Sequence, residues 1–121
     1  MKTLTISWPH GSSGPVVLAA QAELAENFFQ RAKGLLGRSS LAPGTGLLIR
    51  PCNSIHTFFM QFAIDVIFLN RQGQVLKIVR NLRPWRLVWP IWGATQVLEL
   101  PAQTIPADLP RMARLDLCIN S

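Results

Sequence analysis

The stretch "IRPCNSIHTFFMQFAIDVIFLN", residues 49–70, places three residues with metal-binding or nucleophilic side chains at intervals of four, Cys52, His56 and Met60. A spacing of four keeps side chains on one side of either a helix or a strand. A thiol, an imidazole and a thioether together form a soft ligand set that suits Cu(I). Four residues of a strand span about 13 Å, however, so the three could share one ion only if the chain bends or coils.

The same stretch offers a second kind of chemistry. Cys52 beside His56, with Asp65 orienting the imidazole, would make a Cys-His enzyme if the pKa of the thiol were lowered. In the simpler interpretation Cys52 and Met60 fill the core, while His56 bonds to the backbone. We favour a non-enzymatic role, assign no catalytic residue, and expect neither a metal nor a cofactor. The alternative is an enzyme or soft-metal protein centred on Cys52, His56 and Asp65.

The middle of the chain is strongly basic. The whole chain has a formal net charge of +6. Between residues 27 and 98 the only acid is Asp65, against nine bases: Arg31, Lys33, Arg38, Arg50, Arg71, Lys77, Arg80, Arg83 and Arg86. Such a section carries a positive field that concentrates anions. A solvated basic surface with no ligand would show the same composition.

Asp65 lies between apolar neighbours, and a buried carboxylate requires a partner. Arg31, Arg38 or His56 could supply it, as a structural clamp or as part of a polar pocket. We therefore predict a cleft, lined by Arg31, Arg38, His56 and Asp65, that binds a small anionic ligand or a protein partner.

A proline-interrupted arm, "RPWRLVWPIW", carries Trp85, Trp89 and Trp92 beside Arg83 and Arg86. If the arm is exposed, these five residues form an amphipathic surface for a protein partner or a membrane surface. Stacking on single-stranded nucleic acid is a less favoured use of the same residues. If the arm folds back, the tryptophans plug the open end of a barrel.

The elements that must position these residues are mostly strands. "KTLTISW" alternates apolar and polar residues, and "VVLAA" follows after turn residues, which predicts a hairpin. Over about 21–36 the apolar residues recur at helical spacing, which predicts one helix. Short apolar runs separated by turn signals then predict strands to the end of the chain. The expected fold is α+β and mainly β: a small barrel-like or strongly curved antiparallel or mixed sheet, covered by the helix.

Length and composition favour one compact domain over residues 1–121. The chain has 121 residues, 49% of them hydrophobic and 15% charged, which is enough apolar material for a single core. The first twenty residues lack the uninterrupted apolar run of a signal peptide, and no window is long and apolar enough to span a membrane. We therefore expect a cytoplasmic protein whose Cys52 and Cys118 stay reduced.

The order of "RAKGLLGRSSL", "GTGLLIRPCNSIHTFFMQFAIDVIFLNRQGQVLKIV", "LRPWR" and "ATQVLELPA" resembles the prokaryotic family catalogued as domain of unknown function one hundred and ninety-two, the "uncharacterised ACR" proteins. The resemblance covers roughly residues 16–117 and implies a compact β-rich fold without implying an activity. Gln103 stands where the family pattern has a glycine. The residues that carry the resemblance are Arg31, Gly34, Leu35, Arg38, His56, Thr57, Met60, Ile64, Asp65, Leu98 and Glu99.

Overall fold

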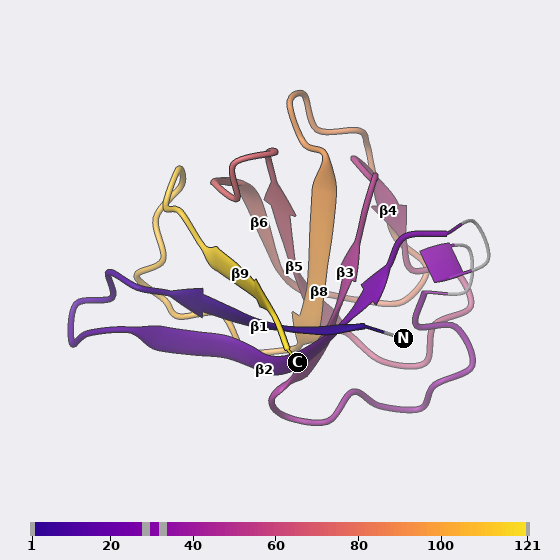
Figure 1. Ribbon diagram of the computed structural model, residues 1–121. Coiled ribbons are helices and arrows are strands. Elements are labelled where there is room, and N and C mark those ends of the chain that lie inside the picture. The colour runs from indigo at the N-terminus through magenta and orange to yellow at the C-terminus, as the bar shows by residue number, and fades with distance from the viewer. Residues whose placement is uncertain (1, 28–29, 32–33, 121) are drawn as a thin grey trace.

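The computed structural model describes residues 2–27, 30–31 and 34–120. Strands account for most of its regular structure (Figure 1). They are β1 (Thr3–Trp8), β2 (Val16–Ala25), β3 (Thr45–Ile49), β4 (Ile55–His56), β5 (Ile64–Leu69), β6 (Val75–Leu82), β7 (Leu87–Val88), β8 (Gln96–Pro101) and β9 (Asp116–Ile119). The mainly β fold expected from the sequence is confirmed at this level.

Seven of these strands form one sheet in the order β6-β5-β8-β3-β2-β1-β9, while β4 and β7 pair separately. Only β2 and β3 pair in parallel among these neighbours. Figure 1 shows that β1 and β2 lie across the view, whereas β5, β8 and β3 run upright, so the sheet is strongly twisted. The sheet order ends at β6 on one side and at β9 on the other, so the sheet is not a closed barrel.

Strands β3, β5 and β8 lie in the middle of the sheet and are buried on both faces. Their sequences are near-continuous apolar runs, as expected for strands without a solvent face. Alternate residues enter two cores. Leu48, Ile67 and Leu98 belong to the first core, which β1 and β2 help to close. The second core contains Ile49, Val66 and Val97 and lies under the segments that carry the candidate site.

The helix predicted over 21–36 is wrong. Its first five residues are the end of β2, where Leu24 and Ala25 pair with Leu48 and Ile49 of β3. Pairing with strands on both sides satisfies the β2 backbone, and this tertiary context outweighs the helical spacing of the apolar residues. Helical backbone appears only at residues 30–31 of the described part, and residues 28–29 and 32–33 of the prediction lie outside it. In the described ranges, no helix has the length and apolar character needed to cross a bilayer.

Candidate functional site

A cavity of about 160 Å³ opens on the face of the sheet that carries the second core. One water needs only about 10–15 Å³ of such space, so the cavity has room for a small molecule or several waters. It is smaller than the roughly 300–1,000 Å³ of sites for drug-sized ligands. Its walls come from the turn after β2, from the segment around β4 and from β8: Arg31, Gly34, Leu35, Leu36, Ile49, Pro51, Cys52, Ser54, Ile55, His56, Met60 and Glu99.

Glu99 is the buried polar group of this cavity. It lies on central strand β8, between Leu47 of β3 and Val66 of β5, and is 4% exposed. No hydrogen bond to its carboxylate is present among the described residues. Burial raises the pKa of Glu99 to about 7, and the positive charge of Arg38 opposes that shift without overcoming it. The cavity therefore contains a carboxyl group that gains or loses its proton near neutral pH.

Arg31 lines the cavity from the turn that follows β2. The side chain of Asn27 accepts a hydrogen bond from the Gln30 amide at 2.8 Å, and the Gln30 side chain accepts one from the Asn27 amide at 3.4 Å, as in a capping box. Backbone bonds from Arg31 to Asn27 and from Gly34 to Gln30 complete one helical turn. This turn holds Arg31 over the cavity, where its Nη1 donates to the Pro51 carbonyl at 3.2 Å.

The Nε of Arg31 is buried and has no hydrogen-bond acceptor within the described ranges. A buried guanidinium nitrogen without an acceptor costs free energy, because desolvation is not repaid. A ligand that brings an acceptor to Arg31 would remove that cost.

Cys52, His56 and Met60 also line the cavity, so the chain does bend enough to bring them to one site. Cys52 Sγ donates to the Ser54 carbonyl at 3.0 Å, and burial raises the pKa of its thiol. His56 is exposed at the rim, with its ring stacked on Phe58 at 4.9 Å and its Nδ1 accepting from the Phe58 amide at 3.3 Å. The thiol is thus held in its protonated form, which is the wrong state for a nucleophile.

Arg38 lies beside the cavity without lining it. Its Nη2 forms an ion pair with Glu23 Oε2 at 2.9 Å, and both side chains are partly exposed. Arg38 therefore acts on the site through its charge, which favours the ionised form of Glu99.

Asp65 lies away from the cavity and has backbone partners in place of an arginine or histidine. Its carboxylate accepts from the amides of Asn81 at 2.8 Å, Thr104 at 3.0 Å and Ile105 at 3.2 Å. Asn81 and Gln103 have positive φ values of 52° and 67°, so Asp65 holds two strained turns in place. Gln103 takes the left-handed conformation although glycine would do so at lower cost.

The tryptophan arm does not fold back as a plug. Trp85, Trp89 and Trp92 are 56%, 75% and 98% exposed, and the adjoining β7 pairs only with β4. The residues of the arm are therefore separate from the cavity and form a surface of their own. In the portion of the chain described, no cluster of three or more His, Cys, Asp or Glu side chains is arranged to hold a metal ion.

Glu99 is the site residue that sequence reasoning missed. The sequence did contain an indication, the acidic residue inside the apolar run "QVLELP". Burying a carboxylate in such a run costs free energy unless the group has a partner or a changed protonation state. Six of the residues that carry the family resemblance line the cavity: Arg31, Gly34, Leu35, His56, Met60 and Glu99.

Comparisons with known proteins agree with this resemblance. The sequence model of a family described as DUF192, "Uncharacterized ACR", matches residues 11–108. A UPF0127 protein of Thermococcus sibiricus is 36% identical over 97 residues, which cover 74% of this chain and 60% of that protein. A UPF0127 protein of Pyrococcus abyssi is 40% identical over 87 residues, covering 67% of this chain and 71% of that protein. The chain thus matches less than two thirds of the length of the Thermococcus relative.

Two solved structures have the same fold. A protein of unknown function from Novosphingobium aromaticivorans superposes with a TM-score of 0.78 at 23% identity, covering 95% of this chain and 84% of that one. A Sinorhizobium meliloti protein described as a "putative transcription regulator" gives a TM-score of 0.78 at 24% identity, covering 97% and 94%. At these identities the likeness establishes the fold alone.

Proposed function

Because the chain belongs to the DUF192 family, whose description gives no activity, we propose from the chemistry of its own cavity that it is a binding module for a small organic anion. The single observation that carries the proposal is that the buried Glu99 carboxyl and Arg31 Nε, which has no hydrogen-bond acceptor among the described residues, line one solvent-accessible space. Arg31 supplies the positive charge that the sequence predicted for the cleft. Of the four residues of that prediction, Arg31 and His56 line the cavity.

A carboxylate is the simplest ligand that satisfies both groups. A guanidinium donates two parallel hydrogen bonds to a planar carboxylate, and a protonated carboxyl donates a third to the same anion. Glu99 provides that donor because its pKa is raised to about 7. When Glu99 is ionised it repels the anion instead, so binding is coupled to proton uptake.

The thiolate enzyme is the weaker alternative for the same space. A nucleophilic cysteine needs a lowered pKa, whereas burial and the nearby Glu99 charge raise that of Cys52. Asp65, the expected orienting group, is occupied by three backbone amides elsewhere. The cavity therefore lacks both features of a Cys-His pair.

The test is an acetate titration of the labelled protein, followed by amide NMR shifts at about pH 6 and about pH 8. With a Glu99 pKa of about 7, acetate should bind roughly tenfold more weakly at the higher pH. Glu99→Gln, which keeps a neutral donor, should bind acetate without this pH dependence. Arg31→Gln should lose binding.

The matched control is Arg114→Gln, because Arg114 likewise donates one bond to a backbone carbonyl and lies outside the cavity. This variant should bind acetate as the parent protein does. Acetate-induced shifts that map elsewhere, or an acetate affinity that rises with pH, would disprove the anion site.

A further inference from the structure

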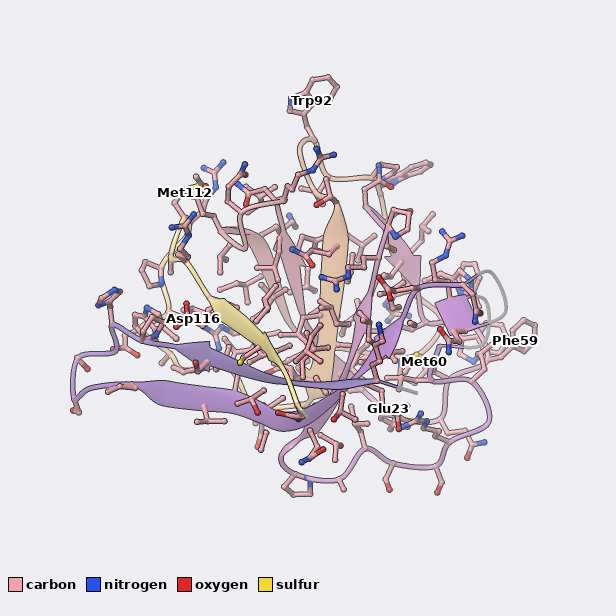
Figure 2. The ribbon with its side chains drawn as sticks, in the orientation of Figure 1. Glu23, Phe59, Met60, Trp92, Met112 and Asp116 are labelled. Atoms are coloured by element: carbon pink, nitrogen blue, oxygen red, sulfur yellow. The ribbon has the colours of Figure 1, made fainter. Side chains whose placement is uncertain are left out.

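Exposed apolar side chains lie along the segment that carries β7 and, through a contact with Trp85, include Phe59 of the turn after β4. We call this set the aromatic ridge, and it consists of Phe59, Trp85, Leu87, Trp89 and Trp92. Their exposed fractions are 70%, 56%, 49%, 75% and 98%. Figure 2 shows Phe59 and Trp92 projecting beyond the outline of the molecule. Single exposed apolar residues are ordinary, but five on one short arm and the turn that contacts it are typical of an interaction surface.

We propose that the aromatic ridge docks this protein on an anionic lipid surface. Tryptophan favours the boundary between lipid headgroups and acyl chains, because its ring is apolar while its N–H still reaches a polar partner. A fully exposed tryptophan at the tip of a turn can enter that boundary without any change in the fold. Trp92 occupies such a tip, just before Gly93, whose φ is 85°.

The backbone conformation at two ridge residues favours the exposure of their side chains. Phe59 and Trp85 both adopt left-handed φ values, 67° and 65°, which are costly for bulky residues. Their rings contact each other with centroids 4.6 Å apart. Strain of this kind persists only when the surroundings enforce it.

Thr57, which is fully buried, is the residue that enforces this geometry. Its hydroxyl donates to the Arg83 carbonyl at 2.6 Å and accepts from the Arg86 amide at 2.9 Å. Its backbone carbonyl accepts from the Trp85 amide at 2.9 Å. These bonds define the loop from 83 to 86, so the exposed rings are held in place by the fold.

The charge of the chain segment that carries the ridge selects the kind of surface. From residue 51 to residue 95 the only acid is Asp65, which is 1% exposed and bonded to three amides. The bases of the same segment are Arg71, Lys77, Arg80, Arg83 and Arg86. Arg83 and Arg86 flank Trp85 directly. Basic residues beside interfacial aromatics give affinity for anionic lipid specifically, because the electrostatic term adds to the apolar one.

The geometry favours lipid over single-stranded nucleic acid. Stacking of bases needs rings laid flat along a groove that follows a backbone. Here Phe59 and Trp92 lie in turns and project from the molecule (Figure 2), and the ridge also contains the aliphatic Leu87. A second copy of the chain would meet the same surface, and the experiment separates this occupant from lipid.

The experiment is co-sedimentation of the full chain with vesicles of phosphatidylcholine alone and of equal parts phosphatidylcholine and phosphatidylglycerol. The protein should partition into the anionic vesicles, and salt should weaken the binding. Trp89→Ala and Trp92→Ala should each lower the partition coefficient about tenfold. Arg83→Gln and Arg86→Gln should each lower it roughly fivefold.

Val17→Ala and Ile119→Ala are the matched controls, because both residues are exposed, at 59% and 55%, and lie outside the ridge. They should leave the partition coefficient unchanged. Quenching of the tryptophan fluorescence of the unmodified chain by brominated lipid tests insertion without any variant.

The proposal is overturned if the chain does not bind anionic vesicles at low salt, or if the controls lose as much binding as the tryptophan variants. Tight binding of a single-stranded oligonucleotide in place of vesicles would also overturn it. The proposal would also be overturned if the chain did not bind vesicles but self-associated, and if Trp92→Ala abolished that self-association. Acetate binding in the cavity is measured separately, so failure of either proposal leaves the other standing.

Discussion

Glu99 shows how burial alone can bring a carboxyl group into the physiological pH range. Taking the side chain out of water disfavours its charged form, and Arg38, whose charge opposes this effect, is already paired with Glu23. The folded protein therefore binds the Glu99 proton more tightly than the unfolded chain does. A proton held in this way affects both the stability and the ligand preference of the cavity.

The stability effect has a definite sign. Because the folded pKa of Glu99 is raised from 4.5 to about 7, its contribution is fully present below about pH 4.5 and is lost as the pH rises through 7. The loss is about 3 kcal/mol, from a difference of about 2.5 pKa units at 1.36 kcal/mol each. Glu99→Gln, which carries no charge, escapes this loss.

Urea denaturation over this pH range measures the effect. The unfolding free energy of Glu99→Gln should rise relative to the parent protein by about 3 kcal/mol between about pH 4 and about pH 8. Asp108→Asn is the control, since Asp108 is exposed and outside the cavity. A parallel pH dependence of the parent and Glu99→Gln would contradict the raised pKa.

Cys52 gives a second prediction at the scale of a residue. Burial and the Glu99 charge raise the pKa of its thiol, while Cys118 is exposed. The thiolate is the reactive form, so Cys52 should react with a disulfide reagent at neutral pH much more slowly than Cys118. The Cys52→Ser and Cys118→Ser variants allow each thiol to be followed alone. Fast reaction of Cys52 would contradict the raised thiol pKa and support the thiolate-enzyme hypothesis.

At the scale of the elements, β5 and β8 bring together residues that the sequence kept far apart. The expected partners of Asp65 were side chains, because a buried carboxylate calls for a cation. The structure instead provides amides from the β6 bulge and from the loop after β8. Sequence periodicity does not reveal such a contact, since it depends on a register shift between β5 and β6.

Asp65→Ala should lower the unfolding free energy by about 4 kcal/mol, because it leaves three amides without their charged acceptor. Asp65→Asn, which keeps one acceptor oxygen, should lose less. Asp108→Ala removes a carboxylate that bonds only the exposed Ser12 hydroxyl, and should change stability by less than about 0.5 kcal/mol. Equal losses for Asp65→Ala and Asp108→Ala in urea denaturation would refute the structural role of Asp65.

The helix and the strands differed in how well the sequence predicted them. Alternation in "KTLTISW" and the apolar runs of β5 and β8 were sufficient, because burial on one or both faces leaves a direct pattern. Leu24 and Ala25 contributed to the helical spacing and so to the wrong helix prediction. A strand that pairs on both sides can carry apolar residues at irregular spacing. The strand is also irregular against β1, with register shifts between Ala22 and Val17.

At the scale of the whole molecule, the two proposed surfaces are built by the same segment. Residues 52–60 supply Cys52, His56 and Met60 to the cavity and Phe59 to the aromatic ridge. The sequence indicated that this stretch was unusual and that the tryptophan arm carried basic neighbours. It did not indicate that Glu99, which lies on a distant strand of the sequence, lines the same cavity as Arg31. That shared location arises only from the strand order of the sheet.

The most direct test of the account is the titration of Glu99 itself, by carbon NMR of protein labelled at the glutamate carboxyl groups. The chain has three glutamates, Glu23, Glu26 and Glu99, and Glu99→Gln identifies the signal. Glu99 should titrate with a pKa of about 7 in the free protein, and saturating acetate should raise that pKa. A carboxyl that titrates near 4.5, or one that acetate leaves unchanged, would contradict the binding site.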